Sequence, residues 1–328
     1  MVNYLVTGGT GQIGSFLCEE LAKEGHKVVC VDFRPNTENI SQIANKITVV
    51  TADIENLGEL LGLIKRYSVE RIIHLAAFLV FDSKERPSKA YQVNILGTNN
   101  VMEATRLLDV NKMVFASSVS VYGDAHPRRA GVVDEQDYPN PPYDPYSTSK
   151  IACELMGKFY RETYGLDINC LRVTSAWGPR RYWGYTGRFN DVVRRAAIGE
   201  DTEVPEDFSY KDEKLKWLYV KDAGHGFSFA SKVKGKTKGY LYNLGSKEAF
   251  GAKEFVGALK AACPDRRIGL KELDKPTAMS MTVAGPNGLN VDCSRIYEEI
   301  GFRQRFSLER AVKDMVEYER ARLRNVPC

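Results

Sequence analysis

The chain has 328 residues, of which 43% are hydrophobic and 27% are charged, proportions typical of a soluble globular protein. Its length exceeds the roughly 250–300 residues at which a single hydrophobic core usually stops growing, so we expect one large domain with a smaller one appended. The net charge of +4 is too small to indicate nucleic acid or a membrane surface as a partner, and no apolar run approaches membrane-spanning length.

The first predicted element is a buried strand over residues 3–7, which leads into a glycine-rich turn. Gly8, Gly11 and Gly14 stand between this strand and an apolar-periodic stretch that predicts a helix ending at Gly25. Such glycines allow a tight turn, a close approach of backbone to pyrophosphate, and close packing of helix on strand. Because the N–H groups and positive dipole end of the helix would face a phosphate, the segment predicts a phosphate-binding turn.

An acid at the end of the second predicted strand, residues 27–32, indicates which dinucleotide binds. Asp32 follows Gly14 by eighteen residues and can accept hydrogen bonds from both hydroxyls of the adenosine ribose. It would repel a 2′-phosphate, so NAD is favoured over NADP. Arg34 leaves NADP open, because a cation two residues further on can partly offset that repulsion.

A second acid, Asp53, follows the apolar run of residues 47–50. One interpretation is that it contacts the adenine amino group. The other is that it caps the helix that begins near Leu57, and the two interpretations are compatible.

The order of the elements predicts the fold class. Strands near residues 3–7, 27–32, 47–51, 71–75, 112–117 and 167–173 alternate with helices. Such alternation predicts an α/β protein with a Rossmann-type, doubly wound parallel sheet that has helices on both faces.

The alternation weakens from about residue 176, which predicts a domain boundary. We expect an NAD-binding domain over residues 1–175 and a smaller, mainly substrate-binding domain over residues 176–328. Segments near 215–245 return to the first domain, where Trp217–Asp222 and Tyr240–Leu244 would rejoin the main sheet. The two domains are therefore interleaved.

A cluster of serines ends the strand predicted at 112–117. Ligands bind at the carboxyl ends of strands in such sheets, so Ser118 can orient a substrate oxygen and donate a hydrogen bond to it. An ordinary polar strand end is the alternative interpretation.

A tyrosine and a lysine four residues apart, Tyr146 and Lys150, follow a predicted loop over residues 124–145 and begin a helix that ends at Gly165. On a helix they share a face, one turn apart. A free tyrosine has a pKa of about 10 and is a poor base at neutral pH, but an ammonium group and an oxidised nicotinamide ring stabilise the phenolate. Tyr146 can then take the proton of a substrate alcohol while hydride leaves its carbon. The alternative is a surface lysine beside a packed tyrosine.

The basic and aromatic segment over residues 180–188 is predicted to lie close to the substrate cleft. It would bind an anionic or polyhydroxylated substrate, or it would be a solvated loop.

The cysteines and histidines do not indicate a metal site. The seven cysteines show no close pairing of the kind that metal ligands have, and four of them fall in apolar patterns that indicate packing: Cys18, Cys30, Cys153 and Cys170. An odd number of cysteines without a signal peptide favours a reducing cytoplasm.

Together these segments resemble the extended short-chain dehydrogenase/reductase family, the NAD-dependent epimerase/dehydratase group. The similarity covers nearly the whole chain. The motifs that carry it are Thr7-Gly8-x-x-Gly11-x-x-Gly14, Asp32, Asp53, His74-Leu75-Ala76-Ala77, Asn94, Ser118, Tyr146-x-x-x-Lys150, Leu171-Arg172-Val173 and Gly178-Pro179-Arg180.

The resemblance implies a role for each motif. Tyr146 is the general base or acid, Lys150 binds the nicotinamide ribose and lowers the tyrosine pKa, Ser118 polarises the reacting oxygen, and Asn94 braces the site. The expected cofactor contacts are Gly8, Gly11, Gln12, Ile13, Gly14, Asp32, Asp53, Ile54, Leu75, Ala76, Ala77, Asn94, Tyr146, Lys150 and Val173. The expected substrate contacts are Ser118, Ser120, Tyr146, Arg180, Trp183 and Arg188.

Two positions depart from the members that act on nucleotide-sugars. Ser175 stands where they usually carry Asn, and Leu215 stands where they commonly carry an Arg that clamps the substrate pyrophosphate, seven residues before Asp222. Leucine cannot reproduce a bidentate guanidinium contact. Residues 214–222 look closer to members that oxidise small substrates, such as the threonine dehydrogenase-like branch.

The first hypothesis is therefore an NAD-dependent dehydrogenase that acts on a secondary alcohol of a sugar, sugar acid or hydroxy amino acid. The alternative is a nucleotide-sugar 4-epimerase similar to UDP-glucose 4-epimerase, in which NAD is reduced only transiently. A dehydratase is disfavoured because Val119 and Ser120 replace its usual Asp-Glu pair. A non-catalytic dinucleotide-binding protein would not need the serine, tyrosine and lysine. By analogy with family members, we expect a homodimer formed through helices over residues 97–108 and 147–164.

Overall fold

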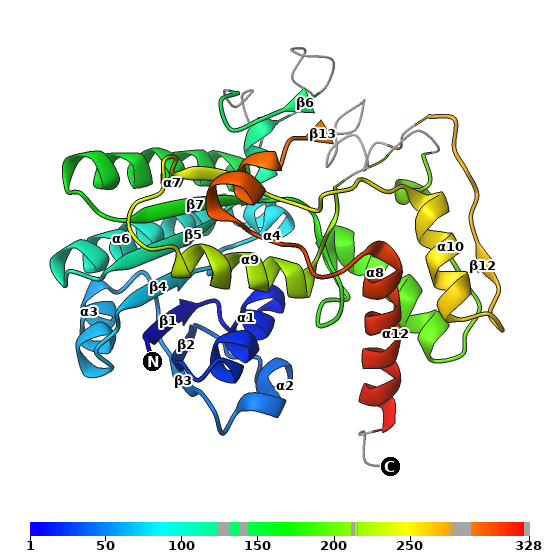
Figure 1. Cartoon of the computed structure of the whole chain (residues 1–328), viewed down its shortest axis with the longest axis horizontal. Helices are drawn as coiled ribbons and strands as arrows, with labels where there is room; N and C mark the ends of the chain where they lie inside the picture. The colour runs from blue at the N-terminus through cyan, green and yellow to red at the C-terminus, as the bar shows by residue number, and fades with distance from the viewer. Residues whose placement is uncertain are drawn as a thin grey trace.

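The structure, a computed structural model, describes residues 1–123, 132–137, 144–210, 214, 216–275, 277 and 290–324. Its centre is a parallel seven-stranded sheet in the order β11-β7-β5-β4-β1-β2-β3 (Figure 1). The strands are β1 (Asn3–Thr7), β2 (Lys27–Asp32), β3 (Thr48–Thr51), β4 (Arg71–His74), β5 (Lys112–Ser118), β7 (Ile168–Val173) and β11 (Leu241–Leu244). The predicted doubly wound α/β fold is confirmed, including the return of the chain to the sheet near Tyr240–Leu244.

The sheet grows in opposite directions from β1 and β4. From β1 the chain proceeds outward through β2 and β3, then crosses back to β4 and continues to β5, β7 and β11. Thr7 at the end of β1 pairs with Val31 on one side and with His74 on the other. Open α/β sheets bind ligands outside the carboxyl ends of the strands at such a reversal.

Each face of the sheet has its own apolar core, because alternate residues of a strand point to opposite sides. In β1, Tyr4 and Val6 belong to one core and Leu5 belongs to the other. The first core is covered by α1 (Gln12–Lys23) and α9 (Val220–Lys232). The second is covered by α3 (Leu57–Arg66), α6 (Thr98–Leu107) and α7 (Pro145–Thr163) (Figure 1). The four cysteines in apolar patterns are fully buried in these two cores, as predicted.

The start of α7 is fixed by its own sequence. The Asp144 side chain accepts a hydrogen bond from the Ser147 N–H at 2.9 Å, and Pro145 occupies the first turn. Gly165 follows the helix with a positive φ of 74°, a conformation that favours glycine. These signals place Tyr146 in the first turn of the helix.

A third apolar core, called the side core below, lies beside the sheet, to the right in Figure 1. It is formed by α8 (Gly184–Ala197), α10 (Ala252–Ala262) and α12 (Leu308–Arg324) around a group of aromatic side chains. The rings of Phe189 and Phe255 lie 4.0 Å apart, centroid to centroid, and Trp177 is buried against both. The chain leaves this core to form α9 and β11, and it returns to form α10 and α12.

The prediction that Trp217–Asp222 rejoins the main sheet is wrong. Only β10 (Leu218–Tyr219) is extended, and it pairs with β8 (Ala176–Trp177) in a separate two-stranded sheet. Helix α9 begins directly afterwards at Val220. The aromatic run therefore contacts two cores: Trp217 and Tyr219 pack in the side core, and Leu218 packs in the sheet core under α1 and α9.

The remaining described elements are short. They are α2 (Thr37–Ile40), α4 (Val80–Glu85), α5 (Pro87–Tyr91), β6 (Val132–Val133) paired with β13 (Asn290–Val291), β9 (Thr202–Glu203) paired with β12 (Ile268–Gly269), and helical turns at Ser41–Ile43, Gln92–Gly97, Val119–Tyr122, Glu206–Phe208 and Ile296–Ile300. Most of the predicted loop over residues 124–145 lies outside the described residues.

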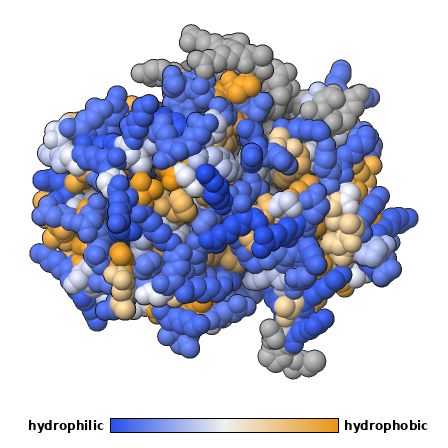
Figure 2. Space-filling view, in the orientation of Figure 1, coloured by the Kyte–Doolittle hydropathy of each residue, from blue (hydrophilic) through white to orange (hydrophobic). Residues whose placement is uncertain are grey.

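The outer surface shown in Figure 2 is mostly hydrophilic, with hydrophobic residues in small separate patches. None of the helices in the described part of the chain combines the length and the apolar character needed to cross a bilayer.

Candidate active site

The glycine turn after β1 is packed too closely for side chains. A Cβ atom on Gly8 would lie 2.7 Å from the Ala76 nitrogen, and one on Gly14 would lie 2.3 Å from the Gly8 carbonyl oxygen. Helix α1 begins at Gln12, and since the residue before it is Gly11, no side chain caps its first turn. The N–H groups of that turn therefore stay open toward the carboxyl edge of the sheet, as a phosphate site requires.

Asp32 lies at the carboxyl end of β2, next to this turn. Its carboxylate accepts hydrogen bonds from the Thr10 hydroxyl at 2.7 Å and from the Arg34 N–H at 3.3 Å. The Arg34 guanidinium lies 5.7 Å from the ring centroid of the exposed Phe33. The carboxylate is thus held at the strand end where a ribose is expected, and the discrimination against NADP stays a prediction.

Asp53 does not cap the helix that follows it, so that interpretation is wrong. The cap of α3 is Asn56, whose side chain accepts the Glu59 N–H at 3.2 Å. Asp53 accepts the Glu55 N–H at 2.9 Å within its own turn. The predicted contact of Asp53 with adenine remains a prediction. Ile54 beside it is buried, and a Cβ atom on Gly97 would lie 2.7 Å from its Cδ1.

The segment after β4 is anchored by a buried histidine. His74 contacts the hydroxyl of Thr7 at 2.6 Å and that of Thr98 at 2.9 Å. Burial and the nearby charge of Lys150 lower the pKa of His74 to about 3, so the ring is neutral at physiological pH. It fixes the backbone from which the half-buried Leu75, Ala76 and Ala77 face the glycine turn.

Asn94 connects this segment to α7. Its side chain accepts the Phe78 N–H at 2.8 Å, and it donates to the Phe78 carbonyl at 3.0 Å and to the Ser149 hydroxyl at 3.1 Å. These three bonds fit the bracing role that the resemblance implies for Asn94.

Ser118, Tyr146 and Lys150 meet at the carboxyl end of β5. Ser118 is the last residue of that strand, and its side chain is close enough to the Tyr146 phenol to lower the pKa of Tyr146. Lys150 is one helical turn after Tyr146, its Nζ 5.4 Å from the phenol ring centroid, and it donates to the Ala116 carbonyl at 2.7 Å. Val173 at the end of β7 is level with Ser118. The sequence-predicted trio is therefore one cluster in space.

Burial controls the protonation of this cluster. It raises the pKa of Tyr146, against the lowering effect of the Ser118 hydrogen bond and of the positive charge of Arg181. It lowers the pKa of Lys150 to about 8. The resemblance implies that Lys150 lowers the pKa of the tyrosine. The Lys150 ammonium donates to a backbone carbonyl, so these contacts alone do not meet that expectation.

A buried ion pair supports the cluster from behind. Arg172 of β7 donates to both carboxylate oxygens of Glu154 in α7, each at 2.8 Å, and the Ser117 hydroxyl donates to the same carboxylate at 2.5 Å. The Arg172 guanidinium also lies 4.8 Å from the Tyr122 ring centroid. This pair is not predicted from the sequence. Its one sequence signal is an arginine within an apolar strand, which requires a buried partner.

The other predicted substrate residues lie in different surroundings from the cluster of Ser118, Tyr146 and Lys150. Ser120 follows Ser118 in a helical turn, and its Oγ atom is buried without a hydrogen-bond partner among the described residues. The Arg180 side chain is only 4% exposed, forms an ion pair with Glu19 and lies 3.8 Å from the Phe16 ring centroid. Arg180 therefore joins α1 to the side core, and its predicted contact with substrate stays a prediction. Trp183 is exposed.

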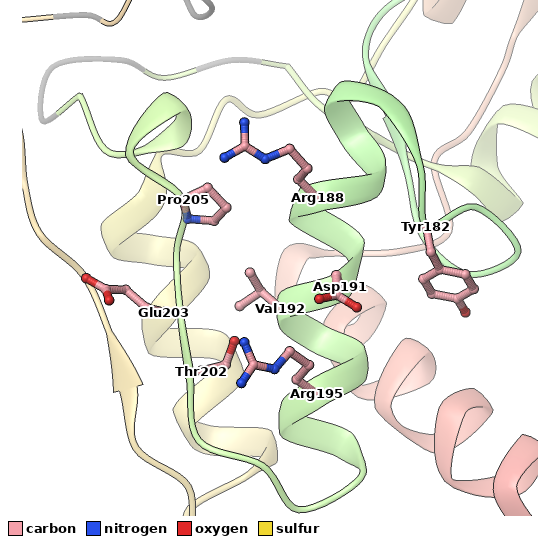
Figure 3. Close-up of a pocket in the computed structure, with 8 residues that line it drawn as sticks. All are labelled: Tyr182, Arg188, Asp191, Val192, Arg195, Thr202, Glu203 and Pro205. Carbon is pink, nitrogen blue, oxygen red and sulfur yellow. The ribbon is translucent and has the colours of Figure 1, made fainter.

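The predicted substrate role of Arg188 also stays a prediction. Arg188 forms an ion pair with Asp207 and lines a cavity of about 240 Å³ between α8 and the segment that holds Thr202 and Pro205 (Figure 3). Seven other residues line this cavity: Tyr182, Asp191, Val192, Arg195, Thr202, Glu203 and Pro205. The cavity lies at the side core, and its lining residues do not include Ser118, Tyr146 or Lys150.

The structure brings a different arginine toward the reactive tyrosine. Arg181 interacts electrostatically with Tyr146 and Asp82, and its guanidinium lies 4.8 Å from the Trp183 ring centroid. The sequence places Arg181 in the basic segment but offers no sign of which arginine faces the site. On the other side, the Gln12 side chain donates to the carbonyls of Gly178 and Pro179, which links α1 to this loop.

The described residues fit a bound NAD. A glycine turn that a Cβ atom would fill, an uncapped helix start, a carboxylate at the end of β2 and the phenol and ammonium groups at the end of β5 lie along one sheet edge. Bound there, a dinucleotide would place its phosphates at α1 and its ribose hydroxyls at Asp32.

Comparison with known proteins identifies the family. A sequence profile of the NAD dependent epimerase/dehydratase family matches residues 4–245. The chain is 30% identical over 325 residues to a UDP-glucose 4-epimerase of Mycolicibacterium smegmatis (96% of this chain, 98% of that protein). It is 37% identical over 320 residues to a putative UDP-glucose 4-epimerase of Methanocaldococcus jannaschii (96% and 97%).

Solved structures agree with this result. The UDP-glucose 4-epimerase of Thermus thermophilus in complex with NAD superposes with a TM-score of 0.77 at 25% identity, covering 97% of this chain and 99% of that one. The chain therefore belongs to the NAD-dependent epimerase/dehydratase family of extended short-chain dehydrogenases/reductases, and it is an NAD-dependent enzyme.

Proposed function

We propose that the protein is a dehydrogenase that oxidises a secondary alcohol of a small hydroxylated substrate, namely a sugar, a sugar acid or a hydroxy amino acid. The observation that carries the proposal is the convergence of Ser118, Tyr146 and Lys150 at the sheet edge that also holds the glycine turn. Those three groups are what proton removal from an alcohol requires.

Bound NAD supplies a hydride acceptor beside this cluster. Ser118 holds the substrate oxygen by a hydrogen bond, and Tyr146 takes the alcohol proton through its phenol oxygen. With NAD bound, the Lys150 ammonium would hold the nicotinamide ribose and, together with the oxidised nicotinamide ring, would stabilise the phenolate that this transfer requires. Ser120, whose buried hydroxyl lacks a partner among the described residues, binds a second substrate oxygen. The part of the chain after residue 175 completes the substrate site.

A small substrate is preferred because the anchors of nucleotide-sugar members are not reproduced. Ser175 stands in place of the usual Asn. Leu215, which stands in place of the pyrophosphate-clamping Arg, lies outside the described residues. Arg180 is engaged with Glu19, so it offers no substitute for that clamp.

A nucleotide-sugar 4-epimerase is the second candidate. What favours it is that two relatives match nearly the whole chain, one named a UDP-glucose 4-epimerase and the other a putative UDP-glucose 4-epimerase. The same serine, tyrosine and lysine would then oxidise the sugar and reduce it again from the other face, with no net release of NADH.

One experiment separates the two candidates. Purified protein is incubated with NAD⁺ and either free sugars, sugar acids and hydroxy amino acids, or UDP-glucose. NADH absorbance that rises with the small alcohols supports the dehydrogenase. Formation of UDP-galactose from UDP-glucose without net NADH supports the epimerase, and it would overturn the first proposal if the small alcohols give no signal.

We also propose a reducing, cytoplasmic location, since the six cysteines among the described residues are buried and free.

A further inference from the structure

The loop before α8 holds Arg181 in a fixed place. Buried Asn190 of α8 accepts the Gly178 N–H at 2.8 Å and donates to the Arg181 carbonyl at 2.9 Å. A Cβ atom on Gly187 would lie 2.6 Å from the Tyr182 carbonyl carbon, so the helix and the loop are in close contact. The backbone of Arg181 is thus clamped from both ends of the loop.

The groups in contact with the Arg181 side chain are uncharged. Its Nε donates to the Trp183 carbonyl at 3.3 Å, and its guanidinium is stacked near the Trp183 ring. A Cβ atom on Gly184 would lie 3.0 Å from its Nη2 and 3.9 Å from Cδ2 of Phe81, so the guanidinium lies beside α4. Its charge interacts with Tyr146 and Asp82.

Arg181 differs from the two arginines nearest to it in sequence. Arg180 is paired with Glu19 and Arg188 with Asp207. Among the residues that the structure describes, the half-buried Arg181 has no ion-pair partner. The charge of Arg181 interacts with Asp82, but the two side chains form no ion pair, so the partly desolvated cation is only partly compensated. A ligand anion that supplies two oxygens relieves the remaining cost. Guanidinium groups suit planar, bidentate anions such as carboxylates.

We propose that Arg181 binds the carboxylate of the substrate, so that the enzyme selects a hydroxy acid (a sugar acid or a hydroxy amino acid) over the corresponding neutral alcohol. This proposal rests on the proposed dehydrogenase function. Asp82 favours a singly charged carboxylate over a doubly charged phosphate, because its own negative charge interacts with the same guanidinium. The Arg181 guanidinium lies beside Phe81 of α4, and α4 packs against α7, the helix whose first turn holds Tyr146. A carboxylate bound to Arg181 is therefore on the side of the site where the alcohol proton is removed.

The test compares matched acid and neutral substrates with the NAD-saturated enzyme. The pairs are gluconate and glucitol, glucuronate and glucose, and 3-hydroxybutyrate and butane-1,3-diol. The variants are R181Q, R181K and R195Q, the last a control on α8 whose arginine is paired with Glu200. We expect R181Q to lower kcat/KM for the preferred acid by about 100-fold, mainly through KM, and R181K to retain part of it. R195Q should leave kcat/KM unchanged for every substrate, and R181Q should leave it unchanged for the neutral member of each pair.

Two results would overturn the proposal. One is a wild-type enzyme that prefers the neutral member of each pair. The other is an R181Q variant that slows acid and neutral substrates equally and shifts the pH profile of kcat to higher pH. Arg181 would then act only on the protonation of Tyr146.

A binding measurement separates failure of this proposal from failure of the proposed function. The thermal midpoint of the NAD-loaded wild type and of R181Q is measured with each acid. If no compound reduces NAD but an acid raises the midpoint of the wild type and not of R181Q, the dehydrogenase proposal fails and the carboxylate site stands. If NADH forms while no acid raises the wild-type midpoint, the carboxylate site is overturned and the dehydrogenase stands.

Discussion

The phenol oxygen of Tyr146 is placed by short-range features on either side of it. The cap at Asp144 sets the first turn of α7, and Ser118 reaches the phenol from the end of β5. Tyr146→Phe removes only that oxygen, so we expect turnover to fall by about 10²–10⁴-fold while the affinity for NAD changes little. Kinetics of NADH formation and calorimetric titration with NAD measure the two effects.

The matched control for that variant is Tyr160→Phe on the same helix. The Tyr160 hydroxyl is bonded to Asn99 and Glu103, far along α7 from the reactive end, so turnover should stay near that of the wild type. Normal turnover in Tyr146→Phe would rule out the general-base role proposed for the phenol oxygen.

Lys150 illustrates the energetic cost of a functional charge. Burial lowers its pKa to about 8, below the unfolded value of about 10.4, so the unfolded chain binds the proton more tightly. Stability therefore rises with pH between about 8 and 10.4, and below pH 8 the full cost of burying the charge is present. Lys150→Met should be more stable than the wild type by about 1–3 kcal/mol at pH 7, although it loses turnover.

Denaturant unfolding at pH 7 and pH 9.5 checks this prediction. The stability difference between Lys150→Met and the wild type should shrink at the higher pH, because the wild-type lysine is then mostly neutral in the folded state. A difference that grows with pH would contradict the assigned direction of the shift.

At the scale of the elements, β5, β7 and α7 are joined by one carboxylate. Glu154 accepts hydrogen bonds from Arg172 and Ser117, and Ser117 directly precedes Ser118, whose catalytic role is a proposal. Glu154→Gln leaves the Arg172 charge buried without its partner, so we expect a loss of about 3–5 kcal/mol in the free energy of unfolding. Urea unfolding measures it. On the same helix, Glu162→Gln breaks an exposed pair with Lys158 and should cost less than about 0.5 kcal/mol.

Equal losses in the two glutamine variants would show that the buried pair does not hold these elements together. A loss in Glu154→Gln accompanied by unchanged kcat would show that the network serves stability without positioning Ser118.

Elements whose signals are local could be predicted from the sequence. The strands of the main sheet are apolar runs, and α7 has its cap, its proline and its terminal glycine within its own sequence. Trp217–Asp222 misled the prediction because an aromatic, β-branched run favours extension locally. Its actual partner is the two-residue strand β8, and a helix begins at Val220.

The candidate site divides in the same way. The cofactor turn and the Tyr146–Lys150 spacing are local patterns, so they could be read directly. Arg180 and Arg181 are adjacent in sequence, yet one is paired with Glu19 and the other faces Tyr146. That difference depends on contacts between residues about 160 positions apart, which one sequence does not reveal.

At the scale of the whole molecule, the outer face of α6 and α7 exposes apolar side chains. Leu155 is 60% exposed and Phe159 is 53% exposed, and Leu107 and Tyr164 are also exposed at the ends of the two helices. We propose that this face forms the homodimer, because burying such side chains against a second copy is favourable. The double variant Leu155→Glu/Phe159→Glu should sediment as a monomer, whereas Leu323→Glu, at an equally exposed site on α12, should leave the dimer intact. A wild type that sediments as a monomer at micromolar concentration, or a double variant that remains dimeric, would refute the assignment of this face.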